Sequence, residues 1–405
     1  MKYIDGGVCA PKGFTANGLL SGIKAGRTRP DTALIYSEIP CVTSGVFTQN
    51  RVKAECVKLT KKHIANGVAQ AVIANSGNAN ACTGEQGAKA ALRMARAVSV
   101  PLKLNIEDVL VCSTGVIGQQ LPVEKIENSA GELVAGLSKH GNVMAREAIM
   151  TTDTEYKETA VEFDIGGKTV TIGTMAKGSG MIHINMGTML GFITTDCAIS
   201  SRMLEKALRE SVACTYNCIS IDGDTSTNDT LLVLANGMAG NQEITEEGKD
   251  YEVFLSALNE INTHMAKKIA GDGEGAQHLV ECRVKGSCDV KTARTLAKSV
   301  VSSNLVKAAF FGKDANWGRI LCAMGYSGAD FTPDDVSVSF ISCEGCITVC
   351  QKGKPVDFDE DKAKKILSQK ETSILVELTD GTAEGTAWGC DLTYDYVKIN
   401  GDYRT

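Results

Sequence analysis

The segment from Lys177 to Cys197 holds the residues whose types and spacing are best suited to chemistry. It has glycine at positions 178, 180, 187 and 191, and from Met189 onward it is apolar like a buried strand. Thr188 therefore opens a core strand directly after the small residue Gly187. A threonine hydroxyl at such a place can attack the preceding carbonyl, shift the acyl group from nitrogen to oxygen, and so allow hydrolysis of the chain. Thr188 then becomes a new N-terminus, whose α-amino group titrates at about pH 8 and can take the hydroxyl proton.

A plainer interpretation of the same residues is a bend that leads into a β-branched strand. Gly-Thr pairs before strands are common, and the residues alone favour the bend. Other routes to catalysis have no support in the sequence. It contains no Gly-x-Ser-x-Gly elbow, no HExxH helix, no GxxxxGK[ST] loop and no dinucleotide-binding GxGxxG, and its only histidines are His63, His140, His183, His264 and His278.

A cysteine cluster near the C-terminus resembles half of a zinc site. It consists of Cys343-Glu-Gly-Cys346 followed by Cys350. The flanking residues alternate like strands, and Glu344-Gly345 suits a tight turn. No second CxxC and no nearby histidine complete a set of four ligands. We therefore predict a hairpin here, and no metal site.

The bulk composition is that of a soluble globular protein. The chain has 405 residues, of which 43% are hydrophobic and 22% charged. A net charge of −6 with scattered basic residues gives no reason to expect nucleic acid or an anionic membrane, and no apolar stretch is long enough to cross a bilayer. The N-terminus lacks the apolar core of a signal peptide, so we expect a cytoplasmic protein whose 15 cysteines are reduced thiols.

The elements that must position these residues alternate between strands and helices. Periodicity predicts strands over 71–74, 108–112 and 231–235, a hairpin of 160–165 and 168–172 around Gly166-Gly167, and helices over 87–100, 123–138, 201–214 (capped by Ser200) and 247–269. From about residue 279 the pattern restarts with a strand over 279–284, a helix over 293–310, several strands and a helix over 360–369. We predict an α/β (α+β) protein with mixed sheets, a main domain of residues 1–280 and a smaller domain of residues 281–405.

Around Thr188 the chain closely resembles the ornithine acetyltransferase family, also called the bifunctional glutamate N-acetyltransferases of arginine biosynthesis. The motif is Lys177-Gly-Ser-Gly-Met181, then Gly187-Thr-Met-Leu190 and Thr194-Thr-Asp196. Further matching segments run in order along the chain, at 74–84, 113–118, 149–154, 221–229, 270–275, 316–320 and 396–405. The resemblance therefore covers essentially the whole sequence.

The resemblance assigns roles to individual residues. It implies that the chain cuts itself after Gly187 and that Thr188 is the nucleophile. It implies that Thr114 and Gly115 stabilise an oxyanion, and that substrate is bound by Thr151, Lys177, Thr188, Glu274, Asn400 and Thr405. Lys177 suits the α-carboxylate of an amino-acid substrate, and Glu274 suits an amine of ornithine or a proton transfer. Without the resemblance, Lys177, Glu274 and Asn400 would be interpreted as ordinary surface or turn residues.

The resemblance also implies a fold and a reaction. The fold is an αββα sandwich like that of self-processing aminopeptidases, with a smaller C-terminal α/β domain whose tail returns to the active site. The mature α chain (1–187) and β chain (188–405) form a heterotetramer of two copies each. The enzyme passes acetyl from N-acetylornithine to glutamate by a ping-pong mechanism, without metal or organic cofactor, and some members also accept acetyl-CoA. Two alternatives stay open, namely a self-cleaving aminopeptidase or amidase, and a binding protein that has lost activity.

The chain departs from the family pattern at two places. His183-Ile184-Asn185 stands where the spacer usually contains proline, and Gly187 stands where alanine is frequent. Glycine leaves the scissile carbonyl open and tolerates unusual φ angles, so we expect cleavage to survive. The spacer change could affect substrate access or the rate of cleavage. We do not assign His183 as a base, because the α-amine of Thr188 already serves as one.

Overall fold

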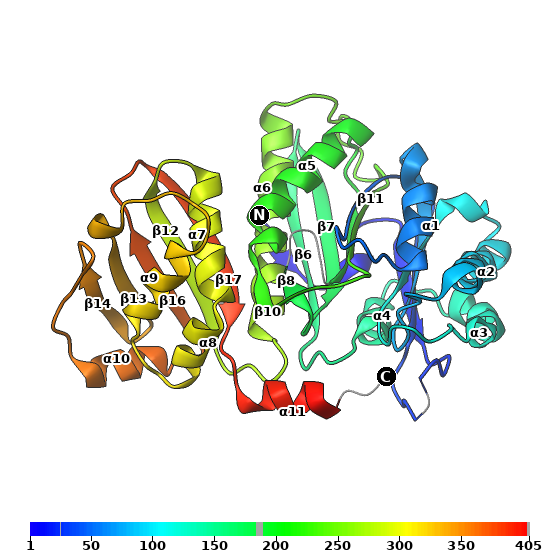
Figure 1. Ribbon diagram of the computed structural model, residues 1–405. Helices are drawn as coiled ribbons and strands as arrows, with labels where there is room; N and C mark the ends of the chain where they lie inside the picture. The colour runs from blue at the N-terminus through cyan, green and yellow to red at the C-terminus, as the bar shows by residue number, and fades with distance from the viewer. Residues whose placement is uncertain (25, 184–188, 403–405) are drawn as a thin grey trace.

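The computed structural model describes residues 1–24, 26–183 and 189–402. Most of the strands in these ranges belong to two sheets, which lie side by side in Figure 1. The larger sheet has nine strands in the order β1-β6-β7-β9-β11-β3-β4-β5, with β2 paired to β3. Its strands are β1 (Lys2–Ile4), β2 (Phe14–Leu19), β3 (Thr32–Phe47), β4 (Val68–Asn75), β5 (Val109–Ser113), β6 (Lys157–Ile165), β7 (Lys168–Lys177), β9 (Leu190–Thr195) and β11 (Thr230–Ala235).

The long strand β3 folds this sheet into two halves that face each other. Its first part, 32–36, pairs with β2 and β4, whereas 42–47 pair with β11, and the register to β4 shifts between Tyr36 and Cys41. One buried cluster joins residues from both halves, including Val72 of β4 and Phe192 of β9. The two halves therefore pack face to face as the central layers of a sandwich.

Helices cover the outer face of each half. Alternate residues of β9 and β11, such as Ile193 and Val233, turn to the outer side and pack with α5 (Ser201–Cys214) and α6 (Lys249–Gly271). On the other outer face, Ile73 packs with α1 (Glu55–His63), α2 (Gly84–Leu102) and α3 (Val123–Ala135). Figure 1 shows these two helical layers on either side of the folded sheet. The predicted αββα sandwich is confirmed.

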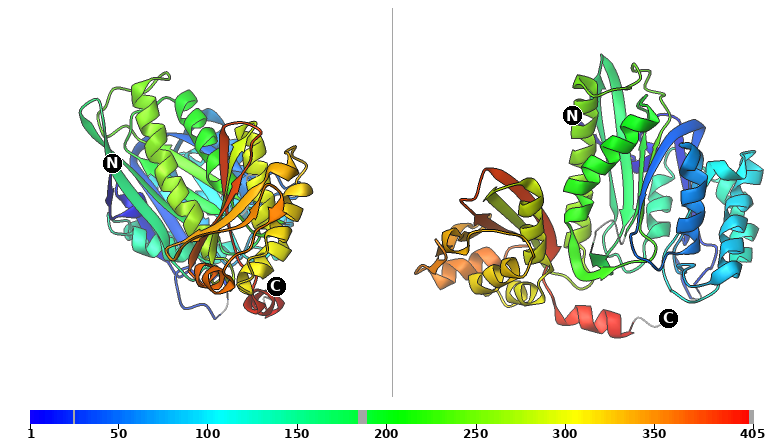
Figure 2. Two further views of the ribbon diagram at one scale, coloured as in Figure 1. Left: turned by 90° about the vertical axis from the view of Figure 1, so that its left-hand side faces the viewer. Right: turned by 45° about the horizontal axis from the view of Figure 1, so that its top comes forward.

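The second sheet is built from the C-terminal part of the chain. Its order is β15-β14-β13-β16-β12-β17. The strands are β12 (Leu279–Ser287), β13 (Ser337–Ser342), β14 (Gly345–Gln351), β15 (Lys354–Pro355), β16 (Glu371–Glu377) and β17 (Ala383–Cys390), with α7 (Val290–Ser302), α8 (Asn304–Phe311), α9 (Trp317–Gly325) and α10 (Glu360–Leu367) beside them. After β17 the chain runs back beneath the larger sheet as α11 (Tyr394–Asp402), as Figures 1 and 2 show. The division into domains at residue 280 stays a prediction.

Local sequence signals account for several of these elements. The β6–β7 turn uses Gly166 and Gly167 at φ of 58° and 78°, angles that suit glycine, and Ser200 caps α5 by accepting a hydrogen bond from Met203 N at 3.4 Å. The Cys343–Cys346 segment forms the predicted β13–β14 hairpin.

Within the described ranges no group of three or more His, Cys, Asp or Glu could hold a metal ion, and no helix is long and apolar enough to span a membrane.

The single helix predicted over 293–310 is wrong. The structure has two helices there, α7 and α8, which are separated at Ser303. The Ser303 hydroxyl accepts a hydrogen bond from Val306 N at 3.4 Å, so it caps a second helix. The helical spacing of apolar residues continues across Ser303, so the sequence pattern does not reveal the break between the two helices.

Candidate active site

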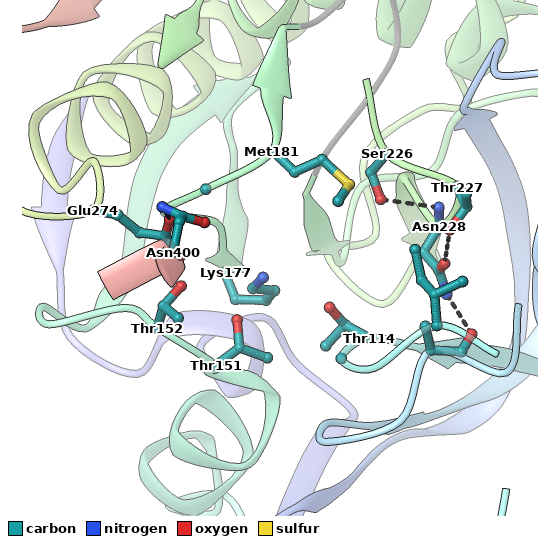
Figure 3. A pocket seen from close by; sticks show the side chains of 14 residues that line it. Thr114, Thr151, Thr152, Lys177, Met181, Ser226, Thr227, Asn228, Glu274 and Asn400 are labelled. Atoms are coloured by element: carbon teal, nitrogen blue, oxygen red, sulfur yellow. Dashed lines mark hydrogen bonds between the residues drawn. The ribbon is translucent and has the colours of Figure 1, made fainter. Parts of the chain in front are cut away.

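A cavity at one end of the larger sheet brings together six of the residues predicted for the site. They come from five separate segments of the chain and surround one space in Figure 3. The six are Thr114, Gly115, Thr151, Lys177, Glu274 and Asn400, and the other lining residues are Ala79, Ile117, Thr152, Gly180, Met181, Ser226, Thr227 and Asn228. The remaining predicted residues, Gly187, Thr188 and Thr405, lie outside the described residues.

The strand that follows Thr188 enters the sheet next to this cavity. Leu190, two residues after Thr188, pairs with Lys177 on one side and with Thr230 on the other. Thr230 N also donates a hydrogen bond to Met189 O at 2.9 Å. The residue next to Thr188 in the chain is therefore fixed in the middle of the sheet, beside the strand that carries Lys177.

Thr114 and Gly115 follow the end of β5 in a backbone turn that only glycine can make. Gly115 has φ of 131°, and a Cβ built on it would lie 2.4 Å from Gly77 C and 2.5 Å from Asn78 N. Thr114 N is anchored to Asn75 O at 2.9 Å. Both residues line the cavity, and a hydroxyl and a backbone N–H from adjacent residues are groups that can bind an oxyanion.

A buried network of charges lies behind the cavity. Lys157 Nζ donates to Asp153 Oδ1 at 2.8 Å and also pairs with Asp272. Asp153 in turn accepts hydrogen bonds from Thr151 N at 3.0 Å and from Gly178 N at 2.7 Å. The network therefore fixes the backbone on both sides of the cavity, next to Thr151 and to Lys177.

The network also sets the charge state of its members. Burial raises the pKa of the Asp153 carboxyl, but the nearby ammonium groups of Lys177 and Lys157 outweigh that effect and hold it well below its ordinary value. Burial lowers the pKa of the Lys177 ammonium, which the carboxylates of Asp153 and Glu274 oppose. An arriving carboxylate would add to the groups that favour the ammonium form of Lys177 and can pair with it.

Glu274 is held in place from two directions. Its backbone N–H donates to Ser179 O at 2.9 Å, and its Oε2 accepts a hydrogen bond from Asn400 Nδ2 at 2.7 Å. A Cβ at Gly180 would lie 2.5 Å from the Glu274 carboxyl carbon, so the glycine leaves room for this side chain. Figure 3 shows Glu274 and Asn400 together at one side of the cavity.

Asp229 is a notable buried carboxyl that sequence reasoning did not single out. It directly precedes β11 and is only 4% exposed, and within the described residues neither oxygen makes a hydrogen bond of ordinary geometry. Burial raises the pKa of this carboxyl well above its ordinary value, and the Thr48 hydroxyl and the Lys177 charge offset only part of that. Asp229 lies in a polar segment that is typical of a turn. Only its place in the family motif could have indicated a role in the site.

Asn228, the residue before it, ties the walls of the cavity together. Its Nδ2 donates to Ala79 O at 2.6 Å and to Ser113 O at 2.7 Å. It therefore joins the loop before β11 to the loop after β4 and to the end of β5. The sequence offered no local signal for this link, because its partners are more than 100 residues away.

Comparison with known proteins decides the family. The model of the ArgJ family matches residues 15–405. The chain belongs to the ArgJ family. The arginine biosynthesis bifunctional proteins ArgJ of Symbiobacterium thermophilum and Caldanaerobacter subterraneus are 52% and 51% identical to it, over 100% of each chain. A crystal structure of the ArgJ protein from Bacillus halodurans is 43% identical, with a TM-score of 0.51, and the match covers 53% of this chain and 100% of that one.

Membership of the ArgJ family confirms the predicted resemblance. It also confirms the predicted function as a bifunctional enzyme of arginine biosynthesis. The relatives match over their full length, so this assignment concerns the whole enzyme. The alternative of a self-cleaving aminopeptidase or amidase is not favoured.

Proposed function

We propose that this ArgJ protein transfers acetyl through Thr188, which becomes an N-terminal residue when the chain is cut after Gly187. N-acetylornithine acetylates Thr188 and leaves as ornithine, and glutamate then takes the acetyl group. Acetyl-CoA serves as a second acetyl donor. The observation that carries the proposal is the convergence of Thr114, Gly115, Lys177, Glu274 and the other predicted residues on one cavity, beside the strand that Thr188 precedes.

The chemistry of the first half-reaction follows from these groups. The α-amine of Thr188 takes the proton of its own hydroxyl, and the oxygen attacks the acetyl carbonyl of N-acetylornithine. The Thr114 hydroxyl and the Gly115 N–H donate hydrogen bonds to the oxyanion that forms. The C–N bond then breaks, the proton passes to the departing amine of ornithine, and acetyl stays on Thr188 as an ester.

The second half-reaction reverses these steps with glutamate. Its amine attacks the ester carbonyl, the same oxyanion forms, and the Thr188 oxygen regains its proton as N-acetylglutamate leaves. Both substrates carry an α-carboxylate, which pairs with Lys177. Glu274, held by Asn400, binds the cationic amine of ornithine. Thr151 and Thr405 add neutral hydrogen-bonding groups.

The assembly and location are part of the same proposal. We propose two α chains (1–187) and two β chains (188–405) in one heterotetramer in the cytoplasm, without a metal or organic cofactor. The motifs shared with the family support this arrangement.

The proposal is tested with the purified protein and the variants Thr188→Ala and Thr188→Ser. We expect the wild type to give two chains by intact mass, and to form N-acetylglutamate from N-acetylornithine and glutamate. Thr188→Ala should remain one chain of 405 residues without turnover, whereas Thr188→Ser retains a hydroxyl and should retain some of both activities. An active wild-type protein that stays uncut would refute the mechanism, and so would a cut Thr188→Ala chain. If acetyl passes only to water when glutamate is present, the protein is a hydrolase.

A further inference from the structure

A second cavity lies between helix α7 and the end of α5 with the turn after it, and His183 of β8 (Ile182–His183) also lines it. Its volume is about 850 Å³, and it shares no lining residue with the catalytic cavity. The lining residues that bear on its chemistry are His183, Lys291, Arg294, Lys298, Ser299 and Tyr326.

The cavity is strongly basic. Lys291, Arg294 and Lys298 are spaced three and four residues apart on α7, so they share one face of the helix. No Asp or Glu lines the cavity in the described part of the chain. The carboxylate that acts on His183 is Asp224, which is not a lining residue. The side chains of Lys291, Arg294 and Lys298 therefore make the lining of this cavity basic.

Two of these cations are partly withdrawn from water. Arg294 is half-buried, and its charge acts to lower the pKa of the nearby Cys214 and Cys218 thiols. Burial lowers the pKa of the Lys298 ammonium to about 8, although the neighbouring Cys218 opposes this shift. A planar guanidinium beside a desolvated ammonium is suited to phosphate, which can accept two hydrogen bonds from the arginine. The hydroxyl of Ser299 adds a neutral donor.

An aromatic ring stands at the same cavity. Tyr326 is 62% exposed, so its ring is accessible to a ligand in the cavity. Exposed aromatic rings beside cationic side chains are the usual platform for stacking a nucleobase. The combination of several cations and an exposed ring indicates a nucleotide that carries more than one phosphate.

The cavity also adjoins the catalytic cavity. Met181 lines the catalytic cavity and His183 lines this one. These two residues are only two positions apart in the chain, so the same short segment contributes to the walls of both cavities. The connecting segment is fixed, because Met181 N and Ile182 N donate to Asp222 at 2.5 and 2.8 Å. A ligand held in the second cavity can therefore extend a flexible arm toward the first.

We propose that this cavity binds the phosphorylated nucleotide of acetyl-CoA and that the thioester arm runs from it to Thr188. The inference rests on the proposed function, in which acetyl-CoA is the second acetyl donor. Neither N-acetylornithine nor glutamate carries a phosphate or a base, so the thioester is the substrate that matches Arg294, Lys298 and Tyr326. The site concerns only this donor, and transfer from N-acetylornithine does not use it.

Binding and kinetics of the mature enzyme test the site. Adenosine 3′,5′-bisphosphate and CoA are titrated by calorimetry into the wild type, Arg294→Gln, Lys298→Gln and the control Arg209→Gln, which removes an exposed charge from α5. Each cavity variant should bind both ligands about tenfold more weakly, as expected for the loss of a charged hydrogen bond, and the control should bind normally. The KM for acetyl-CoA should rise similarly, while transfer from N-acetylornithine is unchanged. Circular dichroism checks that each variant is folded.

The possible outcomes separate this site from the proposed function. Failure of the wild type to bind CoA or the bisphosphate, with normal transfer from N-acetylornithine, overturns the site and leaves the acetyl exchange intact. Equal binding by the wild type and both cavity variants places the nucleotide elsewhere and also overturns it. Binding of inorganic pyrophosphate as tightly as the bisphosphate overturns the nucleotide assignment. Absence of transfer from N-acetylornithine counts against the proposed function, whatever the calorimetry shows.

Discussion

The Asn400 side chain donates a hydrogen bond to the Glu274 carboxylate at 2.7 Å across 126 residues of sequence. Asn400 belongs to α11, which follows the last strand of the smaller sheet, and Glu274 follows α6 of the larger one. The C-terminal helix therefore forms part of the wall of the catalytic cavity. It also sets the direction of the carboxylate to which we assign the ornithine amine.

Replacing Asn400 tests that contact. Asn400→Ala should raise the KM for N-acetylornithine about threefold to tenfold, because a hydrogen bond to a charged group is lost at a partly exposed position. Asn400→Asp should have a larger effect, since it places a second carboxylate beside Glu274. Steady-state kinetics measure both, with the exposed Lys398→Ala on the same helix as control. An unchanged KM in both Asn400 variants would show that the contact does not orient Glu274 for substrate.

Gly115→Ala tests the proposed oxyanion site. The new Cβ meets the backbone of Gly77 and Asn78 at 2.4 to 2.5 Å, so the turn must shift. We expect kcat to fall by about a hundredfold or more, as when one oxyanion donor is lost. Gly118→Ala is the matched control, because Gly118 also has a positive φ, of 83°, but nothing lies within 4 Å of its added Cβ. Equal losses of kcat in the two variants would attribute the effect to backbone strain alone.

Lys157→Met tests the buried charge network. It leaves the buried Asp272 carboxylate without its cation and Asp153 with Lys177 as its remaining one, and breaking a buried pair typically costs about 3–5 kcal/mol. We expect that loss in the free energy of unfolding, measured with urea. The control is Arg209→Met, which breaks an exposed pair with Glu205 on α5 and should cost less than about 0.5 kcal/mol. Similar midpoints for the two variants would mean that the network adds little to stability.

Asp229→Asn should change the pH dependence of stability. The folded state raises the pKa of this carboxyl, so the protein binds its proton more tightly than the unfolded chain does, whose value is about 3.9. The stability gained from that proton is complete below pH ~4 and is lost as the pH rises through the folded pKa. Asparagine stays neutral, so the variant should gain stability relative to the wild type between pH 4 and pH 8 in urea titrations. Two parallel stability curves would contradict the assignment.

The sequence predicted the parts of the fold that local signals specify. The Gly166-Gly167 turn and the Ser200 cap are of this kind, and the family motifs supplied the residues that meet in the cavity. The bend of β3 could not be predicted, because its register shift depends on which strands pair with each part. From the sequence, Lys157 would be predicted to be a surface lysine at the start of a strand. Only the folded chain shows that it is buried and paired with two aspartates.

Strand β9 lies between β7, which precedes the proposed cut, and β11, which follows it. Hydrolysis of the bond before Thr188 would therefore leave two polypeptides that share one sheet, joined by the ladder between β7 and β9 and the ladder between β3 and β11. The paired α and β chains that share a sheet would then come from one precursor chain that folded before it was cut. Separately expressed halves would lack strands that the other supplies, so scission would mark completed folding and could not precede it.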